Sequence, residues 1–194
     1  MNFLAHVYLS GDSDELILGN FIGDYVKGKQ YLKYPAVVQR GILLHRRIDS
    51  FTDQHCIVKQ SAERLRSHYG RYSGVVIDVF YDHFLSTQWN NYHDHPLPEY
   101  VRNIYSLILR KFFILPLQVR NFIPRIIASN RLLSYLQISG VEKALSLMSK
   151  YSTLPNEATF AVETLQTYYE DYHAEFDVFF DELRQYVMQY LSTE

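Results

Sequence analysis

The chain has 194 residues, a formal net charge of -2 and 47% hydrophobic residues. This length suits one domain with a substantial core. No apolar run approaches the roughly 20 residues of a membrane-spanning helix, and the mean hydropathy of -0.18 argues against an integral membrane protein. The single cysteine, Cys56, excludes an internal disulfide framework and a multi-cysteine zinc site.

The amino-terminal segment begins Met1-Asn2-Phe3-Leu4-Ala5-His6. It lacks the basic segment and the small-residue cleavage site of a secretory signal. We therefore expect a cytoplasmic protein that does not act at a membrane.

Helical periodicity dominates the chain, and strand-like alternation is nearly absent. Seventeen Tyr and 12 Phe, with only 8 Gly and 6 Pro, are typical of packed helices. Helices are expected over 14–27, 35–53, 57–69, 75–89, 99–113, 141–151 and 156–191. Gly28 and Gly70 are expected as helix stops, and Pro35 as a helix start. The predicted fold is all-α, a single-domain helical bundle over residues 1–194.

The central part of the chain is basic. Residues 100–141 contain no Asp or Glu but six Arg or Lys residues, whereas acidic residues dominate from Glu142 to the end. A basic segment can attract an acidic macromolecule. From charge alone, solvated helix faces are the simpler explanation.

The first half concentrates side chains that bind metal ions. His45 and Asp49, like Asp78 and Asp82, are four residues apart, so each pair shares a helix face. Their neighbours are apolar, and a buried carboxylate is costly unless it is paired or binds a cation. Mixed imidazole and carboxylate ligands suit Mn²⁺, Fe²⁺, Zn²⁺ or Mg²⁺.

Each of these residues also has a purely structural explanation. Asp24 could belong to a surface turn, His45 could hydrogen-bond Asp49 on a helix surface, and Asp53 could cap the next helix. Asp78 could pair with Arg46 or Arg47. The group as a whole, with two adjoining arginines, favours a functional site.

In combination, these residues resemble the acyl carrier protein phosphodiesterases. The shared motifs are Met1-Asn2-Phe3-Leu4-Ala5-His6, Gly19-Asn20 with Asp24, His45-Arg46-Arg47-Ile48-Asp49 with Thr52-Asp53, and Asp78 with Asp82-His83-Phe84-Leu85. The resemblance implies a branch of the helical HD phosphohydrolases that uses Mn²⁺ or Mg²⁺. It implies removal of 4′-phosphopantetheine from holo-acyl carrier protein. The adjacent His-Asp pair usual in HD enzymes is replaced by Asp82-His83, in reversed order.

A mechanism for this chemistry places the metal ion among Asp24, His45 and Asp82. His6 and His83 are further candidate ligands. Asp49 or Asp78 would orient ligands or accept a proton from the attacking water. Arg46 or Arg47 would neutralise the phosphoryl oxygens, but not both, since adjacent helix positions diverge by about 100°. The basic block 100–141 would dock the carrier protein, which is usually acidic.

Two other functions fit the same residues. A related phosphohydrolase could act on a nucleotide or another small phosphodiester, which needs no protein-docking surface. A non-catalytic helical binding protein could use the polar cluster as a buried salt-bridge network. Nucleic-acid binding is not expected, because the net charge is negative and no reading motif accompanies the basic block. The sequence does not determine the oligomeric state.

Overall fold

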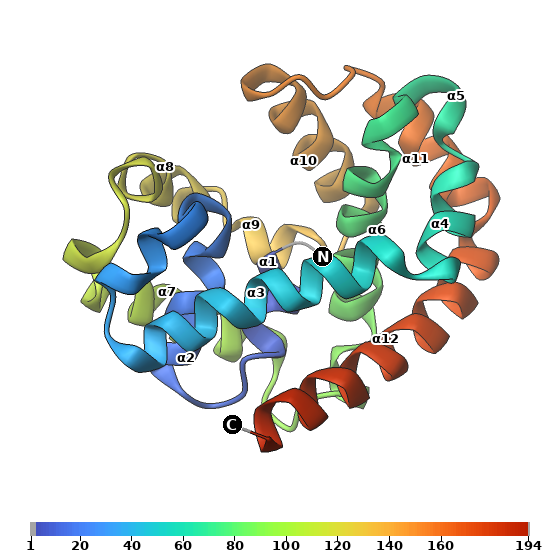
Figure 1. Cartoon of the computed structure of the whole chain (residues 1–194). Helices are drawn as coiled ribbons and strands as arrows, with labels where there is room; N and C mark the ends of the chain where they lie inside the picture. Colours follow the sequence, from blue (N-terminus) through green and yellow to red (C-terminus); the bar gives the residue numbers. More distant parts are fainter. Residues whose placement is uncertain (1–2, 194) are drawn as a thin grey trace.

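The computed structural model describes residues 3–193, which form helices and short connections (Figure 1). Met1 and Asn2 of the opening motif lie outside the described residues. The helices are α1 (Phe3–Tyr8), α2 (Asp14–Ile22), α3 (Ala36–Gln54), α4 (Cys56–Glu63), α5 (Arg66–Tyr69), α6 (Ser73–Thr87), α7 (Leu97–Arg110), α8 (Leu117–Ala128), α9 (Arg131–Ser134), α10 (Ile138–Tyr151), α11 (Ala158–Thr167) and α12 (Tyr169–Ser192). No strand occurs among the described residues, which confirms the predicted all-α class. Within this part of the chain, no helix is both long enough and apolar enough to cross a bilayer.

Helices α2 and α3 pack with their backbones in contact. A Cβ atom on Gly19 would meet the carbonyl oxygen of Val38, and one on Gly41 would meet that of Leu16. Only glycine permits such a close approach. The contact brings the carboxyl end of α2 and the segment after it against the middle of α3.

Helix α6 lies in the core and packs against the aromatic stripe of α12. Phe80, Tyr81, Phe84 and Leu85 are fully buried. The ring centroids of Tyr81 and Phe176 lie 5.5 Å apart. The aromatic stripe of α12 is therefore part of the core rather than a ligand surface.

Two predicted helices are divided in the structure. The expected helix over 57–69 becomes α4 and α5, and the expected helix over 156–191 is interrupted at Tyr168, where φ is -114° and ψ is 31°. The expected helix over 14–27 ends at Ile22. The chain then continues as two 3₁₀ segments, η1 (Gly23–Tyr25) and η2 (Gly28–Lys33).

Candidate metal centre

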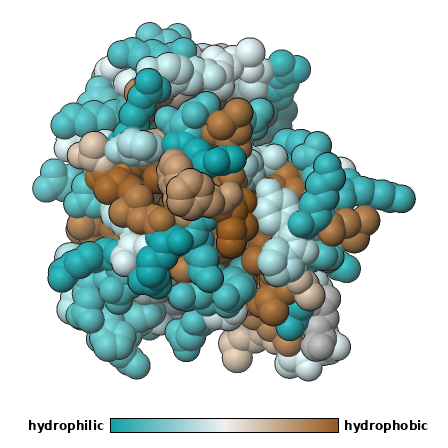
Figure 2. Space-filling model, turned by 90° about the vertical axis from the view of Figure 1, so that its left-hand side faces the viewer, coloured by the Kyte–Doolittle hydropathy of each residue, from teal (hydrophilic) through white to brown (hydrophobic). Residues whose placement is uncertain are grey.

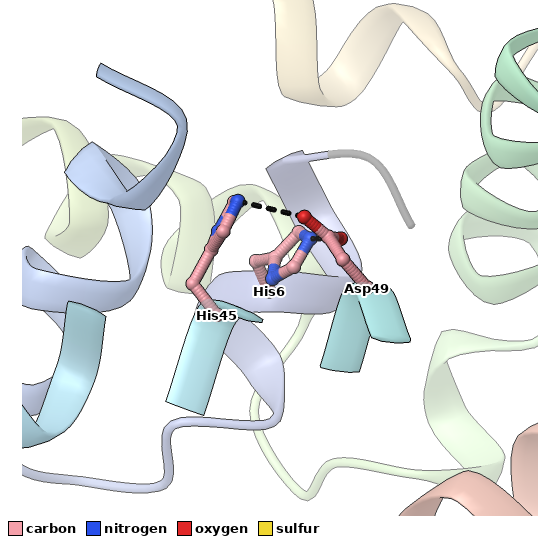
Figure 3. A group of neighbouring side chains, drawn as sticks. All are labelled: His6, His45 and Asp49. Carbon is pink, nitrogen blue, oxygen red and sulfur yellow. Dashed lines mark ion pairs between the residues drawn. The ribbon is translucent and has the colours of Figure 1, made fainter. Parts of the chain in front are cut away.

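Four side chains from three elements converge beside the α2–α3 contact. His6 comes from α1, Asp24 from η1, and His45 and Asp49 from successive turns of α3. The Nε2 atom of His6 lies 3.1 Å from Oδ1 of Asp49. The Nε2 atom of His45 lies 3.0 Å from Oδ2 of Asp49 and 3.4 Å from Oδ1 of Asp24. Figure 3 shows both imidazoles and the Asp49 carboxylate turned toward one another.

The imidazole of His45 fits between α3 and η1 because residue 23 is glycine. A Cβ atom on Gly23 would lie 2.6 Å from Cδ2 of His45 and would also meet Cβ and Cγ. The ring of His6 also stacks on that of His45, at a centroid distance of 4.1 Å. The position of His45 is thus confined by the close approach of Gly23 and by the ring of His6.

A buried amide fixes the orientation of His6. Asn20 is fully buried, and its Nδ2 donates to the backbone oxygen of His6 and to Oγ of Ser10, both at 2.9 Å. A carbonyl oxygen only accepts, so Oδ1 of Asn20 must be the atom that faces Nδ1 of His6, at 2.8 Å. The Nδ1 atom therefore carries a proton, so Nε2, which faces Asp49, holds a lone pair when the ring is neutral.

The protonation of the site follows from burial and charge. Burial lowers the pKa of His6 to about 4, assisted by the neighbouring charge of His45. Burial also opposes the charged form of His45, but Asp24 and Asp49 outweigh it and raise the pKa of His45 to about 9. His45 lowers the pKa of Asp24. Burial opposes ionisation of Asp49, yet the contact with His45 above all holds the pKa of Asp49 well below its ordinary value. Near neutral pH, His6 is neutral and both carboxylates are ionised.

This arrangement fits a divalent cation. Neutral His6 presents a lone pair to a carboxylate oxygen, and two acceptors face each other favourably only across a cation. Both ring nitrogens of His45 are buried without a hydrogen bond, although carboxylate oxygens lie close to Nε2. One ligand atom from each of His6, His45 and Asp49 lies within 4.8 Å of the others. Asp24 adds an exposed carboxylate at the edge of this group.

Asp82, one of the three residues expected around the metal ion, has different contacts. It is fully buried, and its two carboxylate oxygens accept the backbone N–H groups of Leu4 and Ala5 at 3.0 and 3.1 Å. Burial raises the pKa of Asp82 to about 7, against the opposing effect of these two hydrogen bonds. Asp82 therefore caps the start of α1, the helix that carries His6.

His83 lies on another side of α6. Its Nδ1 atom is 2.7 Å from the carbonyl oxygen of Tyr135, and its Nε2 atom is 3.1 Å from the hydroxyl of Tyr169. Burial lowers the pKa of His83. Both nitrogens are used to join α6 to the Tyr135 region and α12, so neither is directed at the four-residue group.

The two predicted arginines differ in their contacts. Nη2 of Arg46 donates to the backbone oxygens of Val26 and Gly28, both at 2.8 Å, and thereby fastens η1 and η2 to α3. Arg47 is exposed, and its guanidinium lies 5.4 Å from the ring centroid of Tyr190.

Asp78, predicted to orient ligands or accept a proton, is half-buried on α6. Burial raises the pKa of Asp78, and the charges of Asp49 and Asp53 act in the same direction. Asp78 is therefore within electrostatic reach of the four-residue group.

Sequence reasoning assigned no role to Asn20 or Gly23. Asn20 stands among Leu16, Leu18 and Ile22 on a strongly apolar helix. A single amide side chain in such a helix indicates a residue that forms hydrogen bonds in the protein interior. Gly23 carries no comparable signal, because only the fold shows that His45 packs against it.

Comparison with known proteins gives a consistent family match. A family profile described as "Acyl carrier protein phosphodiesterase" matches residues 1–183. A protein of that name from Photorhabdus laumondii is 28% identical over 190 residues, covering 97% of this chain and 94% of that protein. One from Enterobacter sp. (strain 638) is 31% identical over 181 residues, covering 93% and 94%.

A protein of the same name from Klebsiella pneumoniae subsp. pneumoniae is 43% identical over 103 residues, 53% of each chain. No solved structure matches. The expected likeness to HD phosphohydrolases therefore stays a prediction.

Proposed function

The chain belongs to the acyl carrier protein phosphodiesterase family, a family of hydrolases, and from this premise we propose that it removes 4′-phosphopantetheine from holo-acyl carrier protein in a reaction that depends on a divalent metal ion. The ligands in this proposal are His6, His45 and Asp49, with Asp24 at the exposed edge. This set differs from the one expected from the sequence. Asp49 becomes a ligand, and Asp82 and His83 become residues that hold the surrounding helices.

The observation that carries the proposal is the pairing of neutral His6 with the Asp49 carboxylate. Their facing atoms are 3.1 Å apart, and the Asn20 amide prevents His6 from turning its protonated nitrogen toward Asp49. Two imidazoles and two carboxylates are a ligand set suited to Mn²⁺, Mg²⁺, Fe²⁺ or Zn²⁺. When bound, such a cation supplies a Lewis acid that lowers the pKa of water and offsets the phosphodiester charge.

Arg46 is the arginine best placed to face a substrate phosphate. It lies three residues before Asp49 and therefore on a neighbouring part of the α3 surface. Arg47 lies two residues from both His45 and Asp49, about 200° around the helix from each. Arg46 binds two backbone oxygens through Nη2 and lies 5.3 Å from the ring centroid of Tyr31, which holds its guanidinium in place. Its Nε and Nη1 atoms form no hydrogen bond with the described residues.

Asp78 is proposed to carry the proton taken from the attacking water. Its raised pKa makes a carboxyl group a better proton acceptor near neutral pH, and its position on α6 places it in the field of Asp49. The proton must finally reach the serine oxygen released from the carrier protein, because an alkoxide is a poor leaving group.

The direct test measures the mass of the carrier protein. Purified enzyme is incubated with holo-acyl carrier protein and Mn²⁺, and the loss of the phosphopantetheine group is followed by mass spectrometry. We expect conversion to the apo-protein, and no conversion after treatment with a chelator. Equal rates with and without chelator would contradict the metal dependence. Hydrolysis of a cyclic or linear nucleotide, without action on the carrier protein, would replace the proposed substrate.

A further inference from the structure

A second acid-free segment adjoins the candidate metal centre. Residues 25–48, between the candidate ligands Asp24 and Asp49, contain no Asp or Glu but six Lys or Arg residues. Together with the six in residues 100–141, they make up 12 of the 19 cationic side chains. The net charge of -2 therefore conceals a strong separation of charge within the molecule.

The fold packs these two segments together. The rings of Tyr25 in η1 and Phe122 in α8 lie 5.0 Å apart between centroids. Arg46 holds the backbone that joins η1 to η2 against α3. Figure 1 accordingly shows α8 beside the blue segment that follows α2. Residues 97 positions apart in the sequence, Tyr25 and Phe122, thus join the two segments into one surface next to Asp24.

The cations on this surface are available to a partner. Lys27, Lys29 and Lys33 are exposed, and so is Arg125, which follows Phe122 by three positions on α8. None of these four forms an ion pair with the described residues. By contrast, Arg110 and Lys111 in the same basic block already pair with acidic residues of α2, Asp14 and Glu15, at 3.4 and 3.7 Å.

Apolar side chains accompany these cations. Leu32 of η2 is 57% exposed, and Leu117 at the start of α8 is 66% exposed. Figure 2, which faces the side of the molecule that carries α7 and α8, shows a hydrophobic area bordered by hydrophilic side chains. A mixed surface of this kind is typical of protein–protein contacts rather than of simple solvation.

We propose that this η2–α8 surface, defined by Lys27, Lys29, Leu32, Lys33 and Arg125, docks the acidic face of the carrier protein. The inference rests on the proposed function, because it identifies the partner with the protein substrate. Lys27 follows the candidate ligand Asp24 by three residues, so a protein bound here lies beside the metal centre. The opposite charges would steer the acidic partner toward the site and set its orientation.

The test reverses charge on this surface and at a matched distant site. The variants are Lys29→Glu with Lys33→Glu, and Arg125→Glu. The control is Lys59→Glu on α4, which lies on the opposite side of the molecule in Figure 1. At low salt, we expect the double variant to raise KM for holo-acyl carrier protein roughly tenfold or more. The increase should shrink as salt is added. The control should change KM by less than about twofold.

A small chromogenic diester, bis(4-nitrophenyl) phosphate with Mn²⁺, reports the metal centre of each variant without a docking step. A KM for the carrier protein that responds equally to the surface variants and to Lys59→Glu would overturn the docking surface while leaving the proposed function intact. Failure of the unmodified enzyme to bind or hydrolyse the carrier protein, despite activity on the small diester, would overturn both.

Discussion

The candidate metal centre and the junction around His83 both bury imidazole rings, but they engage the ring nitrogens differently. At the junction, a backbone carbonyl and a tyrosine hydroxyl occupy both nitrogens of His83. At the candidate metal centre, Nε2 of His6 and Nε2 of His45 face carboxylate oxygens. In one environment histidine joins helices through hydrogen bonds, and in the other, two imidazole nitrogens and a carboxylate are directed at a common point.

The difference shows that burial of a histidine does not identify a ligand. His6, His45 and His83 are all about equally hidden from solvent, at 3%, 5% and 3% exposure. Their partners separate them, because a carboxylate facing a neutral imidazole nitrogen requires a proton or a cation between the two atoms. Substitutions in the two regions should therefore have separable effects on metal content and on stability.

Removal of a ligand should have the greatest consequence. We expect His45→Ala or Asp49→Ala to lower metal-dependent hydrolysis by about 10³-fold or more, equivalent to about 4 kcal/mol of lost transition-state stabilisation. Metal content measured by mass spectrometry should fall together with activity.

The matched substitution at the junction is His83→Asn. It should keep the metal ion and lower the free energy of unfolding by about 1–3 kcal/mol, through loss of buried hydrogen bonds. Stoichiometric metal in His45→Ala, or loss of metal in a folded His83→Asn protein, would reverse the roles assigned to the two regions.

Asn20 should affect metal binding without contacting the metal ion. Asn20→Leu removes the acceptor for Nδ1 of His6, so the ring loses its fixed tautomer and orientation. The affinity for Mn²⁺, measured by titration calorimetry, should fall by about 10–100-fold. Asn20→Asp keeps an acceptor for Nδ1 and should retain more affinity than Asn20→Leu. Equal losses in the two variants would indicate that Asn20 only stabilises the fold.

The metal affinity should depend on pH through His45. Without a cation, Asp24 and Asp49 hold the proton of His45 up to a pKa of about 9, whereas His6 is already neutral above about pH 4. Binding must displace the His45 proton, so the apparent affinity should rise about tenfold per pH unit from roughly pH 6 to 9 and then level off.

Calorimetry at pH 7 in buffers of different ionisation enthalpy should detect release of about one proton per cation. An affinity that is flat over this range would show that the proton does not reside on His45 in the cation-free protein.

Gly23→Ala should lower the metal affinity, but by less than the substitutions of a ligand or of Asn20. The added methyl group would press on the ring of His45 and displace it from the carboxylates, so we expect a reduction of metal affinity by up to about tenfold. Gly74→Ala on α6 is the control, because its Cβ would meet nothing within 4 Å. That variant should be neutral or stabilising by up to about 1 kcal/mol. Unchanged metal affinity in Gly23→Ala would show that the ring has room to move.

The helical class could be predicted because local signals agreed. Pro35 immediately precedes α3, and Gly70, with a positive φ of 50°, is the C-cap of α5, as expected for a helix stop. Gly28 also has a positive φ, 54°, but it begins η2, because α2 already ends at Ile22. The division at Tyr168 could not be predicted, because no proline or glycine marks it. The interruption at Tyr168 therefore reflects the packing of α11 against α12 rather than the local helix propensity.

The site was predictable only within single helices. The four-residue spacing of His45 and Asp49 puts them on one face, and the structure shows their side chains 3.0 Å apart. Spacing could not distinguish that pair from Asp78 and Asp82. Asp82 instead accepts hydrogen bonds from the backbone of α1, some 77 residues away. Because every residue except proline has a backbone N–H group, the sequence does not indicate which of them a distant carboxylate binds. For the same reason, the Asn20–His6 contact needed the fold.

The cap that Asp82 forms on α1 also limits how small a working fragment can be. All four proposed ligands lie within the first 49 residues. Yet α1 has only six residues, far fewer than the ~12–15 that an isolated helix needs to persist in water. A peptide that ends after α3 would contain all four proposed ligands but would lack Asp82, whose carboxylate caps α1. The centre therefore belongs to the folded chain through at least α6, and it could not be excised as a self-sufficient metal-binding peptide.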